Sequence, residues 1–392
     1  MKRALLVAHV ASMIDLFNRD NIRLLQEKGY HVDIACNFNS GNVTSSKRIQ
    51  KFKEEFERMN IRIYQVPFPR KITALDDIFN SYKILKKILI DSDYKVVHCQ
   101  SPIASVLTRL VCKVVKKDMK LLYMAHGFHF YKGASILNWI FYYNIEKYCA
   151  KYTNTILTIN KEDYYLANTK FTKTNSIQYV PGVGIDIEKI RDIKTNKPNK
   201  LSELDIPNDA TILISVGELN KNKNHQVAIK ALAKLKKDNL YYIICGIGPM
   251  QPKLHRMIKK YHLSENIRIM GYREDIIELL KISDIFMFPS IREGLSLSLM
   301  EAMATGLPIL CSNIRGNVDL IRNGEGGYLF QYNDVVALSN HIEQLSDNLE
   351  LREKMGQTNL INIKDKDINR IHEIMSNIYD ALEDEYDNTG DK

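Results

Sequence analysis

Two carboxylates are the feature of this sequence best suited to chemistry. Glu293 and Glu301 lie eight residues apart, where an apolar run that ends at Pro289 is followed by a helix-forming run over residues 296–305. Free backbone amides and the dipole at the start of a helix favour a bound phosphate group. The two carboxylates are separated by roughly 12 Å of helix axis, so they can accept hydrogen bonds from the two ends of a nucleotide-sugar. The alternative interpretation is an exposed glutamate beside an unrelated helix cap.

The surrounding sequence, Ser290 to Pro308, resembles the E-x7-E motif of the retaining, GT-B-fold glycosyltransferases of family 4. The resemblance covers nearly the whole chain, and it is nearest to bacterial transferases that build capsule or exopolysaccharide repeat units. It implies that Glu293 contacts the donor sugar and that Glu301 contacts the ribose. The resemblance also places three intervening residues in the donor site: Gly294, Leu295 and Ser296.

Length and composition indicate a soluble protein of two domains. A chain of 392 residues is long for one hydrophobic core, and its 45% hydrophobic and 26% charged residues are typical of globular proteins. The six cysteines include no C-x-x-C pair, which favours reduced core residues over a structural zinc site. No apolar run is long enough to span a bilayer, and His9 and Asp15 interrupt the apolar N-terminus, so we expect neither a transmembrane helix nor a signal peptide.

Charge is distributed unevenly along the chain. Residues 1–180 carry 28 Lys and Arg against 15 Asp and Glu, whereas residues 181–392 carry 27 against 31. A basic front half predicts an anionic partner, namely an acidic lipid surface, a diphosphate-bearing acceptor or nucleic acid. A lysine-rich composition without functional meaning is the alternative. Of these partners we expect the lipid surface and the acceptor rather than nucleic acid, which predicts a cytoplasmic protein at the inner face of the cytoplasmic membrane.

Short apolar strands alternate with amphipathic helices in both halves of the sequence. This alternation predicts an α/β fold with parallel sheets, in which ligands bind outside the carboxyl ends of the strands. With the family resemblance, it indicates a GT-B architecture of two Rossmann-like, doubly wound domains that face a cleft. The predicted parts are an acceptor-side domain over residues 1–185, a nucleotide-sugar-binding domain over residues 186–365 and a C-terminal helix over residues 366–392 that returns to the first domain.

The segment from Ser215 to His225 resembles the phosphate-binding segment of the family, which usually reads G-R-L-x-x-x-K. Gly217 lets the chain turn close to a ligand at the end of a strand, and Lys223 can pair with a diphosphate oxygen. An exposed lysine at the start of a helix is the alternative for Lys223. Glu218 stands where the family commonly has arginine. A carboxylate cannot neutralise phosphate, so Lys223 or another basic residue must compensate.

Polar or glycine-containing segments follow the next strands of the second half. The sequence G-I-G-P at residues 246–249 resembles a family turn, for which a purely structural role is the alternative. After the following strand, the family holds the nucleotide base through backbone groups, which implies base contacts from Gly271, Tyr272 and Arg273. The polar loop over residues 313–317 is a further candidate for donor contact.

The acceptor-side candidates lie in the first half. His126 ends a predicted strand and resembles the H-G segment whose histidine lies near the sugar in the interdomain cleft; a buried core histidine is the alternative. His98 ends the neighbouring strand and is a candidate for acceptor contact. Ala11 and Ser12 follow the first strand, where many relatives have a glycine pair. Two more acceptor-side candidates follow them: Asp15 and Asn18.

Two other patterns have weaker meaning. Residues 134–145 form an aromatic-rich helix flanked by Lys132 and Lys147, which suits a membrane interface, although core packing explains it equally well. Asp91 and Asp93 match the D-x-D metal motif of GT-A transferases, but they lie at a helix end and we expect no metal there.

These features predict a retaining, metal-independent glycosyltransferase that uses no cofactor. The expected substrates are a UDP-sugar and a saccharide linked to polyprenyl diphosphate, bound where Glu293 and His126 converge in the cleft. Glu293, His126 and Lys223 are the predicted catalytic residues. The alternatives are an isomerase of the UDP-N-acetylglucosamine 2-epimerase type and a non-catalytic module that binds polyanions or membranes.

Overall fold

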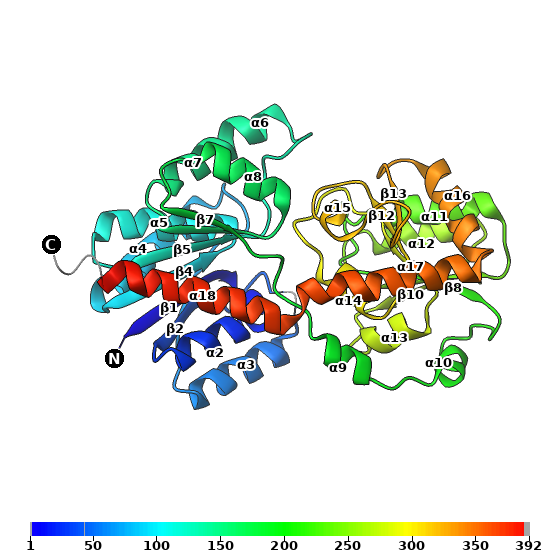
Figure 1. Cartoon of the computed structure of the whole chain (residues 1–392), viewed down its shortest axis with the longest axis horizontal. Coiled ribbons are helices and arrows are strands. Elements are labelled where there is room, and N and C mark those ends of the chain that lie inside the picture. Colours follow the sequence, from blue (N-terminus) through cyan, green and yellow to red (C-terminus); the bar gives the residue numbers. More distant parts are fainter. Residues whose placement is uncertain (1, 43, 388–392) are drawn as a thin grey trace. The chain divides into compact units, whose positions relative to one another are not determined.

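The chain forms two compact units in the computed structural model, which describes residues 2–42 and 44–387 (Figure 1). Unit 1 comprises Met1–Val183 and Ile371–Lys392, and unit 2 comprises Gly184–Arg370. Each unit is built on one parallel sheet with helices. The prediction of an α/β fold with two Rossmann-like domains is therefore confirmed.

The sheet of unit 1 has seven strands in the order β3-β2-β1-β4-β5-β6-β7. The strand order reverses between β1 and β4, and doubly wound sheets bind ligands at such a reversal. The strands are β1 (Arg3–Val10), β2 (His31–Asn37), β3 (Arg62–Gln65), β4 (Tyr94–Gln100), β5 (Lys120–Ala125), β6 (Thr155–Thr158) and β7 (Ser176–Tyr179).

The helices of unit 1 connect these strands and pack on the sheet. The hydrophobic core beneath them joins the apolar runs of the central strands to the apolar faces of α4, α5 and α7. The helices are α1 (Ala11–Phe17), α2 (Arg19–Glu27), α3 (Ser46–Arg58), α4 (Leu75–Asp91), α5 (Pro102–Val115), α6 (Ile136–Asn138), the π-helix η1 (Trp139–Tyr143), α7 (Asn144–Ala150) and α8 (Lys161–Lys170).

The last helix of the chain, α18 (Ile368–Asp387), packs on unit 1 rather than on the unit that precedes it in sequence (Figure 1). Tyr379 is buried, and its hydroxyl lies 2.9 Å from Nδ1 of His98 at the end of β4. Asp380 forms an ion pair with Lys28, which follows α2. The helix is amphipathic, and its buried apolar face explains why it docks on this sheet.

The sheet of unit 2 has six parallel strands in the order β10-β9-β8-β11-β12-β13. Its strand order reverses between β8 and β11, so the carboxyl ends of these two strands border the expected ligand site. The strands are β8 (Thr211–Val216), β9 (Leu240–Cys245), β10 (Ile267–Gly271), β11 (Ile285–Phe288), β12 (Ile309–Ser312) and β13 (Gly327–Phe330).

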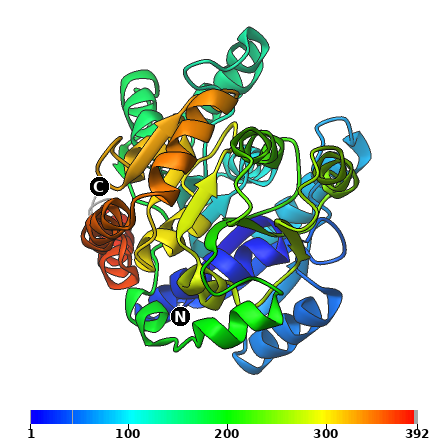
Figure 2. The ribbon, with the colours of Figure 1, turned by 90° about the vertical axis from the view of Figure 1, so that its right-hand side faces the viewer.

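Helices cover both faces of the unit 2 sheet (Figure 2). Alternate residues along a strand point to opposite faces, and in β8 Ile212 and Ile214 belong to one core whereas Leu213 belongs to the other. The helices of this unit are α9 (Ile187–Asp192), α10 (Lys197–Glu203), α11 (His225–Leu235), α12 (Gln251–Lys260), α13 (Ile276–Ile282), α14 (Leu297–Ala304), α15 (Asn317–Leu320), α16 (Val335–Ser346), α17 (Leu349–Asn362) and the 3-10 helix η2 (Ile363–Lys366).

None of the helices in the described part of the chain is both long enough and apolar enough to cross a membrane.

Candidate active site

Two residues that the sequence assigned to catalysis lie in direct contact in unit 2. Nζ of Lys223 lies 2.8 Å from Oε1 of Glu293, and both side chains are mostly shielded from solvent. Lys223 comes just before α11, and Glu293 lies in the loop between β11 and α14. Since β8 and β11 are neighbours in the sheet, the segments that follow their carboxyl ends meet at one edge. The arrangement places a cation and a carboxylate where doubly wound sheets bind ligands.

The ammonium group of Lys223 is positioned by its surroundings. Its Nζ lies 4.5 Å from the centre of the Phe288 ring, at the end of β11, which is a cation–π contact. The backbone amide of Lys223 donates to Oδ1 of Asn220 at 2.9 Å. Gly217 leaves room for the side chain, because a Cβ at this position would lie 3.1 Å from Cε of Lys223. The absence of a side chain at Gly217 therefore lets the side chain of Lys223 pack against this turn.

The loop that carries Glu293 is fixed by residues from two other segments. Asn222 accepts from the amide of Ile291 at 2.8 Å through its carbonyl, and its side chain donates to the carbonyl of Arg292 at 2.9 Å. Nε of Arg315 donates to the carbonyl oxygen of Glu293 at 3.1 Å. The roles of Asn222 and Arg315 were missed by sequence reasoning, although Arg315 lies in the loop over residues 313–317 that was singled out as a donor contact.

Helix α14 begins directly after this loop. Ser296 is its N-cap and accepts from the amide of Leu299 at 3.4 Å, while Ser298 donates to the carbonyl of Val216 at the end of β8. Between Glu293 and the cap lie Gly294 and Leu295, which are half-buried. The start of this helix therefore lies beside the carboxyl end of β8, as a site for the donor diphosphate requires.

Glu301 lies in α14, about one turn after its first residue Leu297, and is largely shielded from water. Burial raises the pKa of its carboxyl group from 4.5 to about 7. The group is thus close to half-protonated near neutral pH, and a ligand that donates hydrogen bonds to it would favour the ionised form. This property fits the predicted contact with ribose hydroxyl groups, which remains a prediction.

The glycines of the turn over residues 246–249 have a structural explanation. A Cβ at Gly246 would lie 1.9 Å from the carbonyl oxygen of Gly217, and one at Gly248 would lie 2.5 Å from that of Leu219. The amide of Gly246 also donates to the carbonyl of Gly271 at 2.7 Å. Glycine is needed at these positions because three backbone segments come close together beside Gly217.

The remaining donor-side candidates differ in their exposure. Tyr272 is 62% exposed and Glu218 is also exposed. Arg273 is held by two carboxylates: its Nε donates to Asp275 at 2.7 Å and its Nη2 donates to Glu203 at 3.0 Å. These contacts raise the pKa of the Arg273 guanidinium further and tie the side chain to the protein. A base contact through the backbone, as the resemblance implies, leaves these ion pairs intact and stays a prediction.

His126 lies in unit 1, directly after β5. Its Nε2 is 2.7 Å from Oε1 of Gln100, and its ring lies 6.4 Å from that of Phe17. Burial lowers the pKa of His126 to about 4, so the imidazole is neutral near pH 7. Because Oε1 of Gln100 can only accept, Nε2 of His126 donates to it, and the neutral ring can accept one further hydrogen bond from a substrate hydroxyl at Nδ1. Its convergence with Glu293 stays a prediction.

The other acceptor-side candidates are engaged within unit 1. His98 is 1% exposed, and its burial against Tyr379 lowers the pKa of the imidazole to about 3. Asp15 is buried and pairs with Arg19 and Arg48 at 2.6 Å each. The last three candidates, Ala11, Ser12 and Asn18, are also buried. The backbone amide of Ser12 donates to Asn42 at 2.9 Å, and the side-chain amide of Asn18 donates to the carbonyl of Met13 at 3.0 Å. Acceptor contacts by these residues stay predictions, and their internal partners show that they also support the fold.

The described residues contain no group of three or more His, Cys, Asp or Glu side chains arranged to hold a metal ion. Asp93, part of the D-x-D sequence, lies 3.3 Å from Nζ of Lys95. The six cysteines are free, and all but Cys112 are buried. That the reaction needs no metal remains a prediction.

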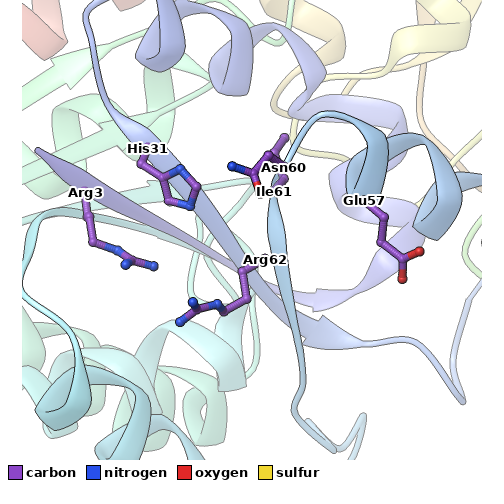
Figure 3. Close-up of a pocket in the computed structure, with 6 residues that line it drawn as sticks. All are labelled: Arg3, His31, Glu57, Asn60, Ile61 and Arg62. Carbon is purple, nitrogen blue, oxygen red and sulfur yellow. The ribbon is translucent and has the colours of Figure 1, made fainter. Parts of the chain in front are cut away.

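A pocket of about 530 Å³ lies at the opposite end of the unit 1 sheet, where β1, β2 and β3 begin (Figure 3). Arg3 and His31 both pair with Asp33, which is fully buried, and Tyr94 donates to the same carboxylate. In Figure 3 the side chain of Arg62 turns toward Arg3. The guanidinium of Arg3 thus neutralises a buried acid at the amino ends of the strands. The pocket is therefore separate from the carboxyl edge that carries His126.

Comparison with known proteins identifies the class of protein to which this two-unit fold belongs. Two family models match the two halves of the chain: "Glycosyl transferase 4-like" matches residues 5–160, and "Glycosyl transferases group 1" matches residues 196–360. The crystal structure of HepE from Anabaena in complex with UDP-glucose superimposes with a TM-score of 0.77 at 16% identity, over 96% of this chain and 99% of that one. WaaG, a glycosyltransferase involved in lipopolysaccharide biosynthesis, gives a TM-score of 0.72 at 16% identity, over 96% and 99%. The fold is that of the GT-B glycosyltransferases.

Sequence relatives narrow this class to a family. EpsD of Bacillus subtilis (strain 168), which is named as a glycosyltransferase, is 32% identical over 387 residues, covering 98% of this chain and 97% of EpsD. An Escherichia coli enzyme, UDP-Gal:alpha-D-GlcNAc-diphosphoundecaprenol alpha-1,3-galactosyltransferase, is 26% identical over 91% of this chain and 92% of its own length. The chain belongs to the GT-B glycosyltransferases of the family 4 type.

Proposed function

We propose that this glycosyltransferase transfers a sugar from a UDP-sugar to a saccharide carried on polyprenyl diphosphate, with retention of configuration, in the synthesis of a capsule, exopolysaccharide or other cell-surface glycan. The observation that carries the proposal is the 2.8 Å contact between Lys223 and Glu293 at the carboxyl edge of the unit 2 sheet. A cation for the diphosphate and a carboxylate for the sugar are what a nucleotide-sugar requires from one site.

The donor is proposed to lie along the start of α14. Glu293 accepts hydrogen bonds from hydroxyl groups of the sugar, the amides of residues 294–296 and Lys223 hold the diphosphate, and Glu301 accepts from the ribose. Glu218 is exposed and acidic, so Lys223 supplies the charge that arginine supplies in many relatives. The choice of UDP is supported by the galactosyltransferase relative, whose name states that UDP-Gal is its donor.

Transfer breaks the bond between the anomeric carbon and the diphosphate oxygen and forms a bond from the acceptor oxygen to the same carbon. Both events occur on one face of the sugar, so the configuration is retained and no protein nucleophile takes part. The acceptor proton passes to an oxygen of the departing diphosphate. Negative charge grows on that diphosphate as the bond breaks, and Lys223 with the amides at the start of α14 stabilises it. No metal ion or cofactor is assigned to the step.

The acceptor is proposed to bind unit 1. Residues 1–180, which form most of this unit, carry 28 Lys and Arg against 15 Asp and Glu, and this balance suits a diphosphate carried on a lipid and an anionic membrane surface. The galactosyltransferase relative is named for a diphosphoundecaprenol-linked acceptor, which supports a substrate of the same class. His126, neutral near pH 7, is proposed to hold a hydroxyl group of the transferred sugar. A location at the inner face of the cytoplasmic membrane follows from this choice of acceptor.

The proposal is tested by incubating the protein with a panel of UDP-sugars and lipid-linked mono- and disaccharides, followed by mass spectrometry of the lipid fraction. One UDP-sugar should extend one acceptor by the mass of a single sugar, with equimolar release of UDP. Conversion of the nucleotide-sugar in the absence of any acceptor would favour an isomerase instead. Tight, salt-dependent polyanion binding without turnover of any donor would favour a non-catalytic module.

A further inference from the structure

Unit 1 contains an apolar pocket of about 250 Å³ that has no role in the reaction proposed above. It is bordered by α5, by the loop over residues 127–130 and by the segment of η1 and α7. Its wall is almost entirely hydrocarbon, and representative residues are Val106, Leu110, Phe128, Phe130, Phe141 and Ile145. An engineered apolar cavity of about 150 Å³ binds benzene, so this pocket has room for a larger apolar group.

The polar groups at the base of the pocket are already neutralised. Glu146 contributes to the lining, and its Oε2 lies 2.8 Å from Nη1 of Arg109, which is fully buried. The hydroxyl of Tyr123 is 3.2 Å from Oε1 of Glu146, and the Arg109 guanidinium lies 4.0 Å from the Tyr123 ring centre. Because the charges of Arg109 and Glu146 neutralise each other and the rest of the lining is apolar, the pocket suits a hydrocarbon chain rather than a sugar.

An exposed apolar surface continues from the pocket. Ile136 and Leu137 of α6 are 77% and 76% exposed, while Ile140 and Phe141 of the π-helix are 61% and 47% exposed. Phe141 belongs both to this surface and to the pocket wall. Contiguous exposed apolar groups mark interaction sites, and π-helical turns occur frequently at functional sites. The four residues are called the apolar ridge below.

The chain segment that forms most of the pocket is basic in sequence, and the pocket lies beside His126. Residues 102–151, which supply most of the pocket, carry eight Lys and Arg against two Asp and Glu. The loop at its rim begins at Gly127, immediately after His126. A molecule with a hydrocarbon chain in the pocket therefore has its head near the histidine assigned to the sugar. A lipid diphosphate has this combination of parts.

We propose that the pocket binds the first isoprenoid units of the lipid-linked acceptor and so holds the diphosphate and its sugar beside His126. This inference rests on the proposed function, since it assigns the lipid part of the acceptor to a place in unit 1. The apolar ridge then contacts the membrane from which the isoprenoid chain emerges.

Trp139 provides a direct measurement, because it is the only tryptophan of the chain and its ring lies 5.6 Å from that of Phe130 in the pocket wall. Titration with farnesyl diphosphate should shift or quench its fluorescence in a saturable way. Inorganic pyrophosphate, which lacks the chain, should not produce this change at equal concentration. An equal response to both compounds would overturn the proposal, because charge alone would then account for binding.

Two substitutions in one helix give a matched pair. Val106→Phe fills the pocket from α5, whereas Val114→Phe adds the same group at a position of α5 that is 48% exposed and outside the pocket lining. The first should weaken binding of farnesyl diphosphate at least tenfold and the second should leave it unchanged. Leu110→Phe is a second filling variant should Val106→Phe fold poorly by circular dichroism. Equal affinity in both filling variants and the control would overturn the proposal.

A third variant separates the pocket from general membrane binding. Changing Ile136 and Leu137 to serine should reduce sedimentation with phosphatidylglycerol vesicles while preserving the response to farnesyl diphosphate in solution. A Trp139 response that requires vesicles and is absent with soluble farnesyl diphosphate would overturn the pocket as an isoprenoid site.

Failure of this inference is distinguishable from failure of the proposed function. If transfer to a lipid-linked saccharide occurs and Val106→Phe leaves its KM unchanged, the pocket assignment is wrong and the reaction stands. If no UDP-sugar is used but farnesyl diphosphate binds in a Val106-dependent manner, the reaction is wrong and the isoprenoid pocket stands. The inference predicts transfer with a KM for the lipid-linked acceptor raised about tenfold in Val106→Phe and UDP affinity unaltered by calorimetry.

Discussion

Replacing Glu301 with glutamine should remove a pH dependence from the stability of unit 2. The carboxyl group is shielded inside α14, and burial raises its pKa from 4.5 to about 7. Glutamine has the same shape and stays neutral, so it keeps the packing while removing the titration. The comparison of the two proteins therefore isolates one group.

The sign and size of the effect follow from the two pKa values. Below pH 4.5 the carboxyl group is protonated in both states, and between 4.5 and about 7 the folded state keeps a proton that the unfolded state has lost. Rising pH therefore removes stability until the folded group has ionised as well. The full shift corresponds to about 3 kcal/mol, of which about 2.5 kcal/mol is expected between pH 5 and pH 8.

Urea unfolding of both proteins at pH 5 and pH 8 measures this difference. The wild type should lose about 2.5 kcal/mol relative to Glu301→Gln over that interval. If both proteins respond to pH in the same way, Glu301 is not held in a site that opposes its ionisation, and the reasoning fails.

The pH dependence of UDP binding tests the role of Glu301 independently of stability. If the ionised carboxylate accepts hydrogen bonds from the ribose, UDP affinity in the wild type should rise between pH 6 and pH 8 more steeply than in Glu301→Gln. The ionisation of UDP itself affects both proteins alike. Superimposable calorimetric profiles would refute the ribose assignment.

Lys223→Met should weaken UDP binding about tenfold or more, because a hydrogen bond to a charged group contributes about 1.5–3 kcal/mol; unchanged affinity by calorimetry would remove Lys223 from the phosphate site. Transfer activity should survive EDTA, and a loss that Mn²⁺ restores would direct attention back to Asp91 and Asp93. Glu146→Gln should lower the free energy of unfolding by about 3–5 kcal/mol, because it leaves Arg109 buried without its partner; a loss below about 1 kcal/mol in denaturant unfolding would show that the pair is not isolated from water.

Local sequence signals predicted the frame of the donor site well. The apolar run before Pro289 forms β11, and α14 falls within the predicted residues 296–305. The helix ends at Ala304, two residues before Gly306, whose φ of +77° favours glycine. Proline, glycine and hydrophobic runs act on their immediate neighbours, and this is why a single sequence is sufficient to place them.

The contact between Lys223 and Glu293 was not predictable from local signals. The two residues are 70 positions apart and meet because β8 and β11 pair in the sheet. The family resemblance assigned both to one site, but only the strand order shows why they touch. The fixing of the Glu293 loop by Asn222 and Arg315 depends on the same topology and was therefore missed.

Buried polar residues in unit 1 were harder still to interpret. Asp15 and His98 are predicted to face an acceptor, which stays a prediction, and the sequence did not show that their side chains also meet Arg48 of α3 and Tyr379 of α18. Arg109 is likewise fully buried, and it pairs with Glu146 of α7. In each pair the partners lie far apart in sequence, and no periodicity or composition of one segment reveals its partner in another.

The central claim, that Glu293 holds the donor sugar while neighbouring groups hold the nucleotide, is tested most directly by measuring Glu293→Gln with UDP and with the UDP-sugar that the wild type uses. UDP affinity should stay close to that of the wild type and transfer should fall by orders of magnitude, in a protein with an unchanged circular dichroism spectrum. Near-normal transfer by this variant would show that Glu293 does not hold the donor sugar.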